Sequence, residues 1–63
     1  MKVRQILKIL RKDGWYIDHH TGSHRQMCHP TKPGTVTVAG KPNETLHPKI
    51  VTSIFKQAQI EEP

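Results

Sequence analysis

Residues 22–27, Gly-Ser-His-Arg-Gln-Met, hold the side chains of this sequence that are best suited to chemistry. Among them is His24, and imidazole is the one kind of side chain whose unperturbed pKa lies near neutrality, which suits it to accept or release a proton at physiological pH. Beside it, Arg25 carries a guanidinium that can bind a phosphate through two hydrogen bonds, and Ser23 and Gln26 add a hydroxyl and an amide. The combination suggests a phosphodiester substrate, but a lone histidine is weak evidence, and on residue types alone an ordinary surface histidine is the more common interpretation.

Size and charge narrow the choice of function. A chain of 63 residues forms one small domain and has no room for a deep, enclosed cavity, so any active site must lie on an open face or in a shallow groove. Ten Lys and Arg against five Asp and Glu give a net charge of +5. That charge suits a polyanion such as nucleic acid, and it equally suits a soluble basic protein with no such partner.

Cysteine content and hydropathy indicate the compartment. The single cysteine, Cys28, excludes an intrachain disulfide and fits a reducing cytoplasm. No uninterrupted apolar run resembles a signal peptide or a membrane span. We therefore expect a cytoplasmic domain with no membrane association.

Two segments have the apolar spacing of amphipathic helices. Residues 2–12 contain neither Gly nor Pro, and Gly14 is a suitable stop. A second helix is expected to begin near Pro48, a residue favoured at the first helical position. The polar side of the first helix carries three cations that could face either phosphates or solvent, namely Lys8, Arg11 and Lys12.

Three short strands are expected between the helices, over residues 15–20, 23–28 and 35–39, with Thr21-Gly22 as the first turn. In the second strand the only large apolar residue is Met27, so alternation places Ser23 and Arg25 on the core side and His24, Gln26 and Cys28 on the other. In the first strand the same alternation places His19 with Ile17 and His20 with Asp18. The expected fold is α+β, in the order α-β-β-β-α, with both helices on one face of a three-stranded antiparallel sheet and His24 on the exposed face.

Several of these segments together resemble the HicA (YcfA-like) toxin family of bacterial and archaeal toxin–antitoxin systems. The matching residues occur in the family's order, and they are Gly14-Trp15, Gly22-Ser23-His24, His29-Pro30, Pro33-Gly34 with the strand that follows, and Ser53 to Ala58. Relatives often have a basic residue in the first strand where this chain has His19 or His20, and glycine where it has Gln59. The resemblance covers residues 1–60 and leaves 61–63 as a frayed C-terminal tail.

The resemblance implies a double-stranded-RNA-binding-like fold and an endoribonuclease that cleaves mRNA, arrests translation and is neutralised by a HicB-like antitoxin in a hetero-oligomer. It places the family's catalytic histidine at His24. Without a metal or other cofactor, such an enzyme uses the 2′-hydroxyl of RNA as the nucleophile, helped by a general base and a general acid. We expect His24 to be one of them, with Ser23 and Gln26 orienting groups and with four cations near phosphates: Arg25, Lys8, Arg11 and Lys12.

Some alternatives stay open at this point. The second proton-transfer group could be His20, Tyr16, a lysine or water. Four histidines between residues 19 and 29 raise the possibility of a metal site, but strand alternation separates them and no carboxylate or thiolate set completes a zinc shell, so no metal is expected. A non-catalytic RNA-binding module with the same fold is the main rival function, followed by a subunit that binds an acidic protein.

Overall fold

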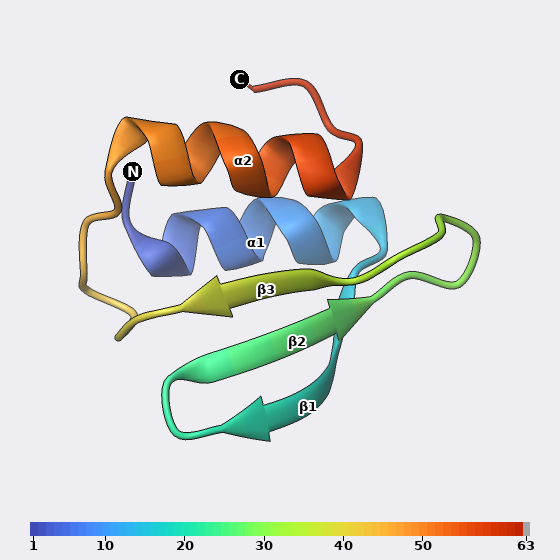
Figure 1. Ribbon diagram of the computed structural model, residues 1–63, viewed down its shortest axis with the longest axis horizontal. Helices are drawn as coiled ribbons and strands as arrows, with labels where there is room; N and C mark the ends of the chain where they lie inside the picture. The colour runs from blue at the N-terminus through green and yellow to red at the C-terminus, as the bar shows by residue number, and fades with distance from the viewer. Residues whose placement is uncertain (63) are drawn as a thin grey trace.

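The computed structural model describes residues 1–62 and contains two helices and one antiparallel sheet (Figure 1). Along the chain these elements are α1 (Val3–Asp13), β1 (Tyr16–Thr21), β2 (His24–Cys28), β3 (Val36–Ala39) and α2 (Pro48–Ala58). The strands pair in the order β1-β2-β3, so β1 and β3 are the two edges. The predicted α+β fold, with its α-β-β-β-α order, is confirmed.

Both helices begin and end for identifiable local reasons. In α1 the residues spaced for one face, from Val3 to Leu10, are buried, and the helix ends at Gly14, whose φ of 114° is accessible to glycine. At the start of α2, His47 accepts a hydrogen bond at its Nδ1 from the Lys49 N–H at 3.1 Å. This helix ends at Gln59, which takes the left-handed conformation (φ 56°) without being a glycine.

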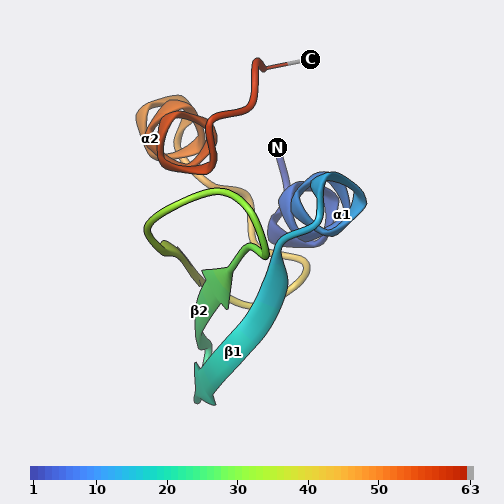
Figure 2. The ribbon, with the colours of Figure 1, turned by 90° about the vertical axis from the view of Figure 1, so that its right-hand side faces the viewer.

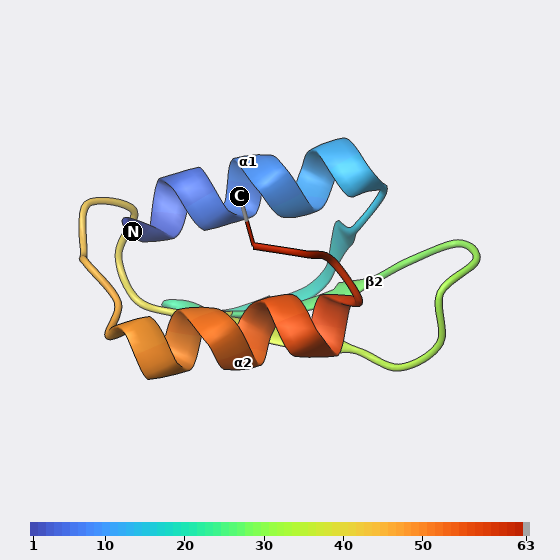
Figure 3. The same ribbon diagram turned by 90° about the horizontal axis from the view of Figure 1, so that it is seen from above.

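The core lies between the two helices and the strands β2 and β3. Figure 3 shows α1 and α2 running side by side above the sheet, and their apolar faces meet buried side chains of the strands such as Met27, Val36 and Val38. By contrast, β1 begins beside the end of α1 and runs away from both helices (Figure 2), and Ile17 is its only residue that is even half-buried. The helices therefore cover the inner face of β2 and β3, while β1 projects into solvent.

The register of the hairpin corrects one prediction. Ile17 pairs with Met27, as alternation requires, but the next pair is His19 with Gln26, so Asp18 is an extra residue and forms a β-bulge. Because directly opposed residues share a face, His19 lies on the outer face with Gln26, and His20 lies on the inner face opposite Arg25. The predicted faces of His19 and His20 were wrong, since strict alternation does not continue through a bulge.

A network around His29 joins the connection after β2 to the end of α1. Its Nδ1 accepts the backbone N–H groups of Thr31 and Lys32 at 3.1 and 3.0 Å, so the ring proton is on Nε2, which donates to the Asp13 carbonyl at 2.7 Å. The ring also meets Trp15 edge-on, with centroids 5.1 Å apart. The His29-Pro30 motif thus has a structural role just beyond the end of β2.

Lys32 extends the network to the second helix. Its ammonium contacts the Asp13 carboxylate at 2.6 Å and the carbonyls of Ala58 and Gln59 at 3.1 and 3.0 Å. The hydrogen bond from Lys32 lowers the pKa of the Asp13 carboxyl below its ordinary value of 3.8. Partial desolvation of that carboxyl acts in the opposite direction, but its effect on the pKa is smaller. One lysine therefore ties together the C-terminal ends of α1 and α2.

Of the predicted tail 61–63, Pro63 lies outside the described residues, and the Glu62 carboxylate accepts a hydrogen bond from the Thr52 hydroxyl at 2.6 Å. Within residues 1–62, neither helix has the length and apolar character needed to span a membrane.

Candidate functional site

His24 lies on the outer face of the sheet, the face turned away from Met27 and the core. On one side it is opposed by Thr21 of β1, and on the other by Ala39 of β3. Two residues further along β2, Gln26 is opposed by His19 and by Thr37. We call these six residues the outer-face site. The predicted outward position of His24 and Gln26 is confirmed by this register.

The imidazole of His24 is free to act on a ligand. The residue is exposed, and within residues 1–62 its ring has no hydrogen-bond or ion-pair partner. This sets it apart from His29 and His47, whose ring nitrogens bond to the backbone. A histidine that has neither a packing role nor a capping role, and that stands among polar side chains, is a reasonable proton-transfer group.

A groove of about 440 Å³ lies along the free edge of β3, between this strand and α2. Its sheet side includes Thr37 and Ala39 of the outer-face site and Ser23 of the hairpin turn. Its far wall is α2, which contributes apolar side chains including Ile50, itself half exposed. The groove thus includes Ala39, the β3 partner of His24, and offers both apolar and polar contacts, as small-ligand sites commonly do.

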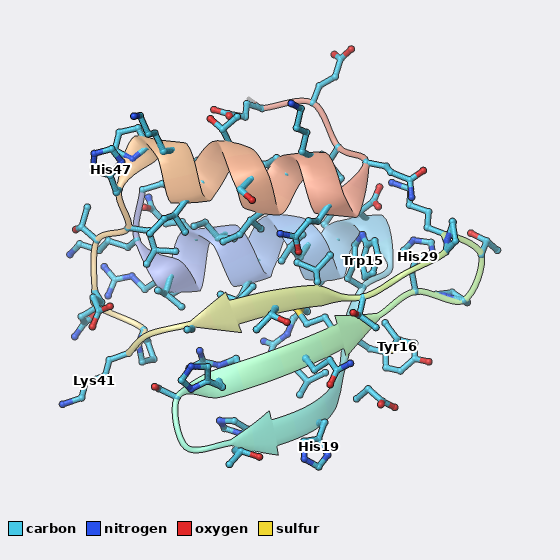
Figure 4. The ribbon with its side chains drawn as sticks, viewed as in Figure 1. Trp15, Tyr16, His19, His29, Lys41 and His47 are labelled. Atoms are coloured by element: carbon cyan, nitrogen blue, oxygen red, sulfur yellow. The ribbon has the colours of Figure 1, made fainter. Side chains whose placement is uncertain are left out.

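Lys41 brings a positive charge to this groove, which Glu44 also lines with a negative charge. Lys41 follows β3, lines the groove and extends from the end of the sheet that carries the β1–β2 turn (Figure 4). Lys41 was not among the residues predicted to bind substrate. Its position depends on how the loop leaves β3, which residue types and spacing do not specify.

Arg25, expected near a phosphate, faces the other way. It is only 8% exposed on the inner face, and its Nη1 donates hydrogen bonds to the carbonyls of Ser23 at 3.1 Å and Gly40 at 2.9 Å. The Gly40 N–H in turn bonds to the Ser23 carbonyl at 3.1 Å. Arg25 therefore fastens the hairpin turn, and with it Ser23, to the end of β3, and the structure does not bring it together with His24.

The three cations predicted on α1, Lys8, Arg11 and Lys12, are all exposed. They project from the side of the helix opposite its buried face, and α1 packs on the inner face of the sheet. They are accessible to a polyanion, but they do not share the outer-face site with His24.

The histidines do not gather into a metal centre. In the part of the chain that the structure describes, no three His, Cys, Asp or Glu side chains are grouped so as to hold an ion. His19 and His24 share the outer face, His20 is on the inner face, and His29 is bonded to the backbone. The outer-face site therefore offers imidazole, hydroxyl and amide groups rather than a set of metal ligands.

Comparison with known proteins identifies the family of the chain. A search of curated proteins finds no match. The family model described as the HicA toxin of bacterial toxin–antitoxin systems matches residues 3–60, which include every helix and strand and the whole outer-face site. Because this match spans nearly the whole chain, the protein belongs to the HicA toxin family.

Proposed function

We propose that this protein is the toxin of a type II toxin–antitoxin system and acts in the cytoplasm as a metal-independent endoribonuclease. It cleaves mRNA and so arrests translation. The observation that carries the proposal is the exposed, unbonded imidazole of His24 at the centre of an open polar face, in a chain of the HicA toxin family. A strand residue that served only the fold would not need an imidazole at this position.

The reaction is an internal transfer of the phosphodiester. The 2′-oxygen of one nucleotide attacks the adjacent phosphorus as its proton passes to a base, and the 5′-oxygen of the next nucleotide leaves as it receives a proton from an acid. The products are a 2′,3′-cyclic phosphate and a 5′-hydroxyl. His24 is one of the two proton-transfer groups, and one well-placed imidazole contributes about 10²–10⁴-fold to the rate.

The groups around His24 position the RNA. Gln26 shares the outer face and lies two residues from His24, so its amide can hydrogen-bond a phosphate or a 2′-hydroxyl. On the other side, Ser23 and Lys41 line the groove, where Lys41 binds a backbone phosphate and the apolar wall at Ile50 receives a base. The cations of α1 contact phosphates farther along the strand and add affinity that does not depend on sequence.

An open face also suits control by a partner. Because the outer-face site is not enclosed by other elements of the chain, a HicB-like antitoxin that lies across it excludes RNA without unfolding the toxin. Covering the exposed Ile50 and the groove beside it adds apolar contact to such an interface. We therefore expect a hetero-oligomeric complex in which the outer face is buried.

The test is the chemistry of the products. The purified protein is incubated with a defined transcript in excess chelator, and the fragment ends are identified. We expect fragments that end in a 2′,3′-cyclic phosphate, and no cut where the 2′-hydroxyl at a cleavage site is replaced by hydrogen. Binding of RNA without fragments would contradict the proposal and favour the non-catalytic RNA-binding module. Cleavage that stops in chelator would show that a metal is needed.

A further inference from the structure

The β-bulge at Asp18 brings a second imidazole to the outer face. Without the extra residue, His19 would lie on the inner face with Ile17. With it, His19 opposes Gln26 and is the diagonal neighbour of His24, whose own partner on β1 is Thr21. We propose that His19 is the second catalytic proton-transfer group of the outer-face site. This inference rests on the proposed endoribonuclease function.

The spacing of the two histidines suits one phosphate between them. Diagonal neighbours on the same face of an antiparallel pair have Cα atoms about 7–8 Å apart. From that separation, two imidazoles that point out of the sheet can approach a phosphodiester from opposite sides. In-line displacement needs this geometry, because the attacking 2′-oxygen and the departing 5′-oxygen lie on opposite sides of the phosphorus.

His19 is free to take this role. It is exposed, and in residues 1–62 its ring makes no hydrogen bond or ion pair. Figure 4 shows it projecting from β1 away from both helices. Its neighbour His20 is exposed too, but it lies on the other face, opposite the cation Arg25, and so cannot reach a phosphate held at His24. The bulge thus distinguishes two adjacent histidines.

Few other ionisable groups compete on this face. Asp18 immediately precedes His19 at the bulge, and Tyr16 and its partner Cys28 lie farther along the same two strands. β3 adds only Thr37 and Ala39 beside β2, and neither helix covers β1. His19 and His24 are therefore the two imidazoles at the centre of the site.

The step balances with these two groups alone. One imidazole accepts the 2′-hydroxyl proton as the 2′-O–P bond forms, and the imidazolium of the other donates its proton to the 5′-oxygen as the P–O5′ bond breaks. One proton is taken up and one is released, so exchange with water restores both rings. No oxidant, metal or other reactant is required.

The experiment compares three variants of the full chain with wild type: His19→Gln, His24→Gln and His20→Gln as the matched control. Cleavage of a defined RNA is followed under single turnover, with protein in excess, between about pH 5 and 9. We expect His19→Gln to slow cleavage about 10²–10⁴-fold with RNA affinity changed only a few-fold, and His20→Gln to stay within a few-fold of wild type. The wild-type rate should rise and then fall as the pH increases. His19→Gln and His24→Gln should each lose one of the two limbs of this profile, either the rising or the falling one.

A second substrate assigns the two roles. When sulfur replaces the 5′-oxygen at the cleavage site, the leaving group no longer needs a proton. The variant that lacks the acid should then recover most of its rate, and the variant that lacks the base should not. His19→Gln that cleaves both substrates as wild type does, with both limbs of the pH profile intact, would overturn the role of His19 and leave His24 standing. Absence of cleavage by wild type would overturn the proposed function, and this inference with it.

Discussion

The Nη1 of Arg25 donates a hydrogen bond to the carbonyl of Gly40 at 2.9 Å, from the face of the sheet opposite His24. The same nitrogen bonds to the Ser23 carbonyl, so one buried cation connects the β1–β2 turn to the end of β3. Arg25→Met keeps much of the apolar part of the side chain but leaves the carbonyls of Ser23 and Gly40 without this hydrogen-bond donor. We expect the free energy of unfolding in urea to fall by about 1–3 kcal/mol.

The same variant distinguishes a structural role from substrate contact. With the fraction of folded protein matched to wild type, Arg25→Met should cleave RNA within about tenfold of the wild-type rate, because the guanidinium does not reach the outer face. An unchanged free energy of unfolding together with a loss of RNA binding would show that Arg25 holds a phosphate after all.

The Asp13–Lys32 contact predicts how stability depends on pH. The hydrogen bond from Lys32 lowers the pKa of the Asp13 carboxyl in the folded protein below 3.8, so at acid pH the unfolded chain binds the proton more readily. The stabilisation is therefore complete above about pH 4 to 5 and is lost as the pH falls through the folded-state pKa. Asp13→Asn should be less stable than wild type in urea at pH 7, and the difference should shrink in strong acid.

Asp18→Asn is the matched control for this experiment. Asp18 is exposed at the bulge and makes no ion pair within residues 1–62, so its substitution should change stability little at either pH. A difference between Asp13→Asn and wild type that stayed constant down to strong acid would contradict the titration argument.

The cations of α1 should affect affinity rather than chemistry. Replacing Lys8, Arg11 and Lys12 together by glutamine removes three charges from an exposed face without touching the core. We expect weaker RNA binding and a slope of log affinity against log salt that is shallower by up to about 2, as for three single-strand phosphate contacts. The single-turnover rate at saturating protein should stay near that of wild type. An unchanged salt slope would mean that α1 does not face RNA.

Lys41 tests whether the groove between β3 and α2 holds RNA. Lys41→Gln should weaken binding of a cleavable RNA about tenfold, which corresponds to one charge-assisted hydrogen bond to a phosphate. Lys49→Gln is the control, since Lys49 is also exposed, near the start of α2, but does not line the groove. Equal effects of the two substitutions on binding would indicate only a general contribution of charge.

Much of the fold could be predicted because local signals agree with one another. The apolar spacing from Val3 to Leu10, Gly14 after it and Pro48 at the second start correspond to α1 and α2 within a residue or two. The buried position expected for Met27 was enough to assign the two faces of β2, and it correctly placed His24 and Arg25 on opposite faces. These features depend on residues close in sequence, so residue types and their spacing are sufficient to predict them.

The faces of β1 could not be obtained from apolar alternation. The predicted turn at Thr21-Gly22 was one residue too early, since the structure has Thr21 in β1 and the turn at Gly22-Ser23. Counting from Ile17 places His19 inside, whereas counting back from the observed turn places it opposite Gln26 and outside. The two counts disagree by one residue, and the bulge at Asp18 accounts for the difference. The hydrogen bonds of Arg25, the groove and the position of Lys41 depend on contacts across β3 and α2, which no local pattern specifies.

The central claim is that His24 transfers a proton in RNA cleavage, and a single-turnover comparison on one defined transcript tests it most directly. Wild type, His24→Gln and the control His20→Gln are measured at equal folded fraction, confirmed by circular dichroism and urea unfolding. We predict that His24→Gln cleaves about 10²–10⁴-fold more slowly than wild type while His20→Gln is nearly unaffected. Equal cleavage rates for His24→Gln and wild type would contradict the assignment.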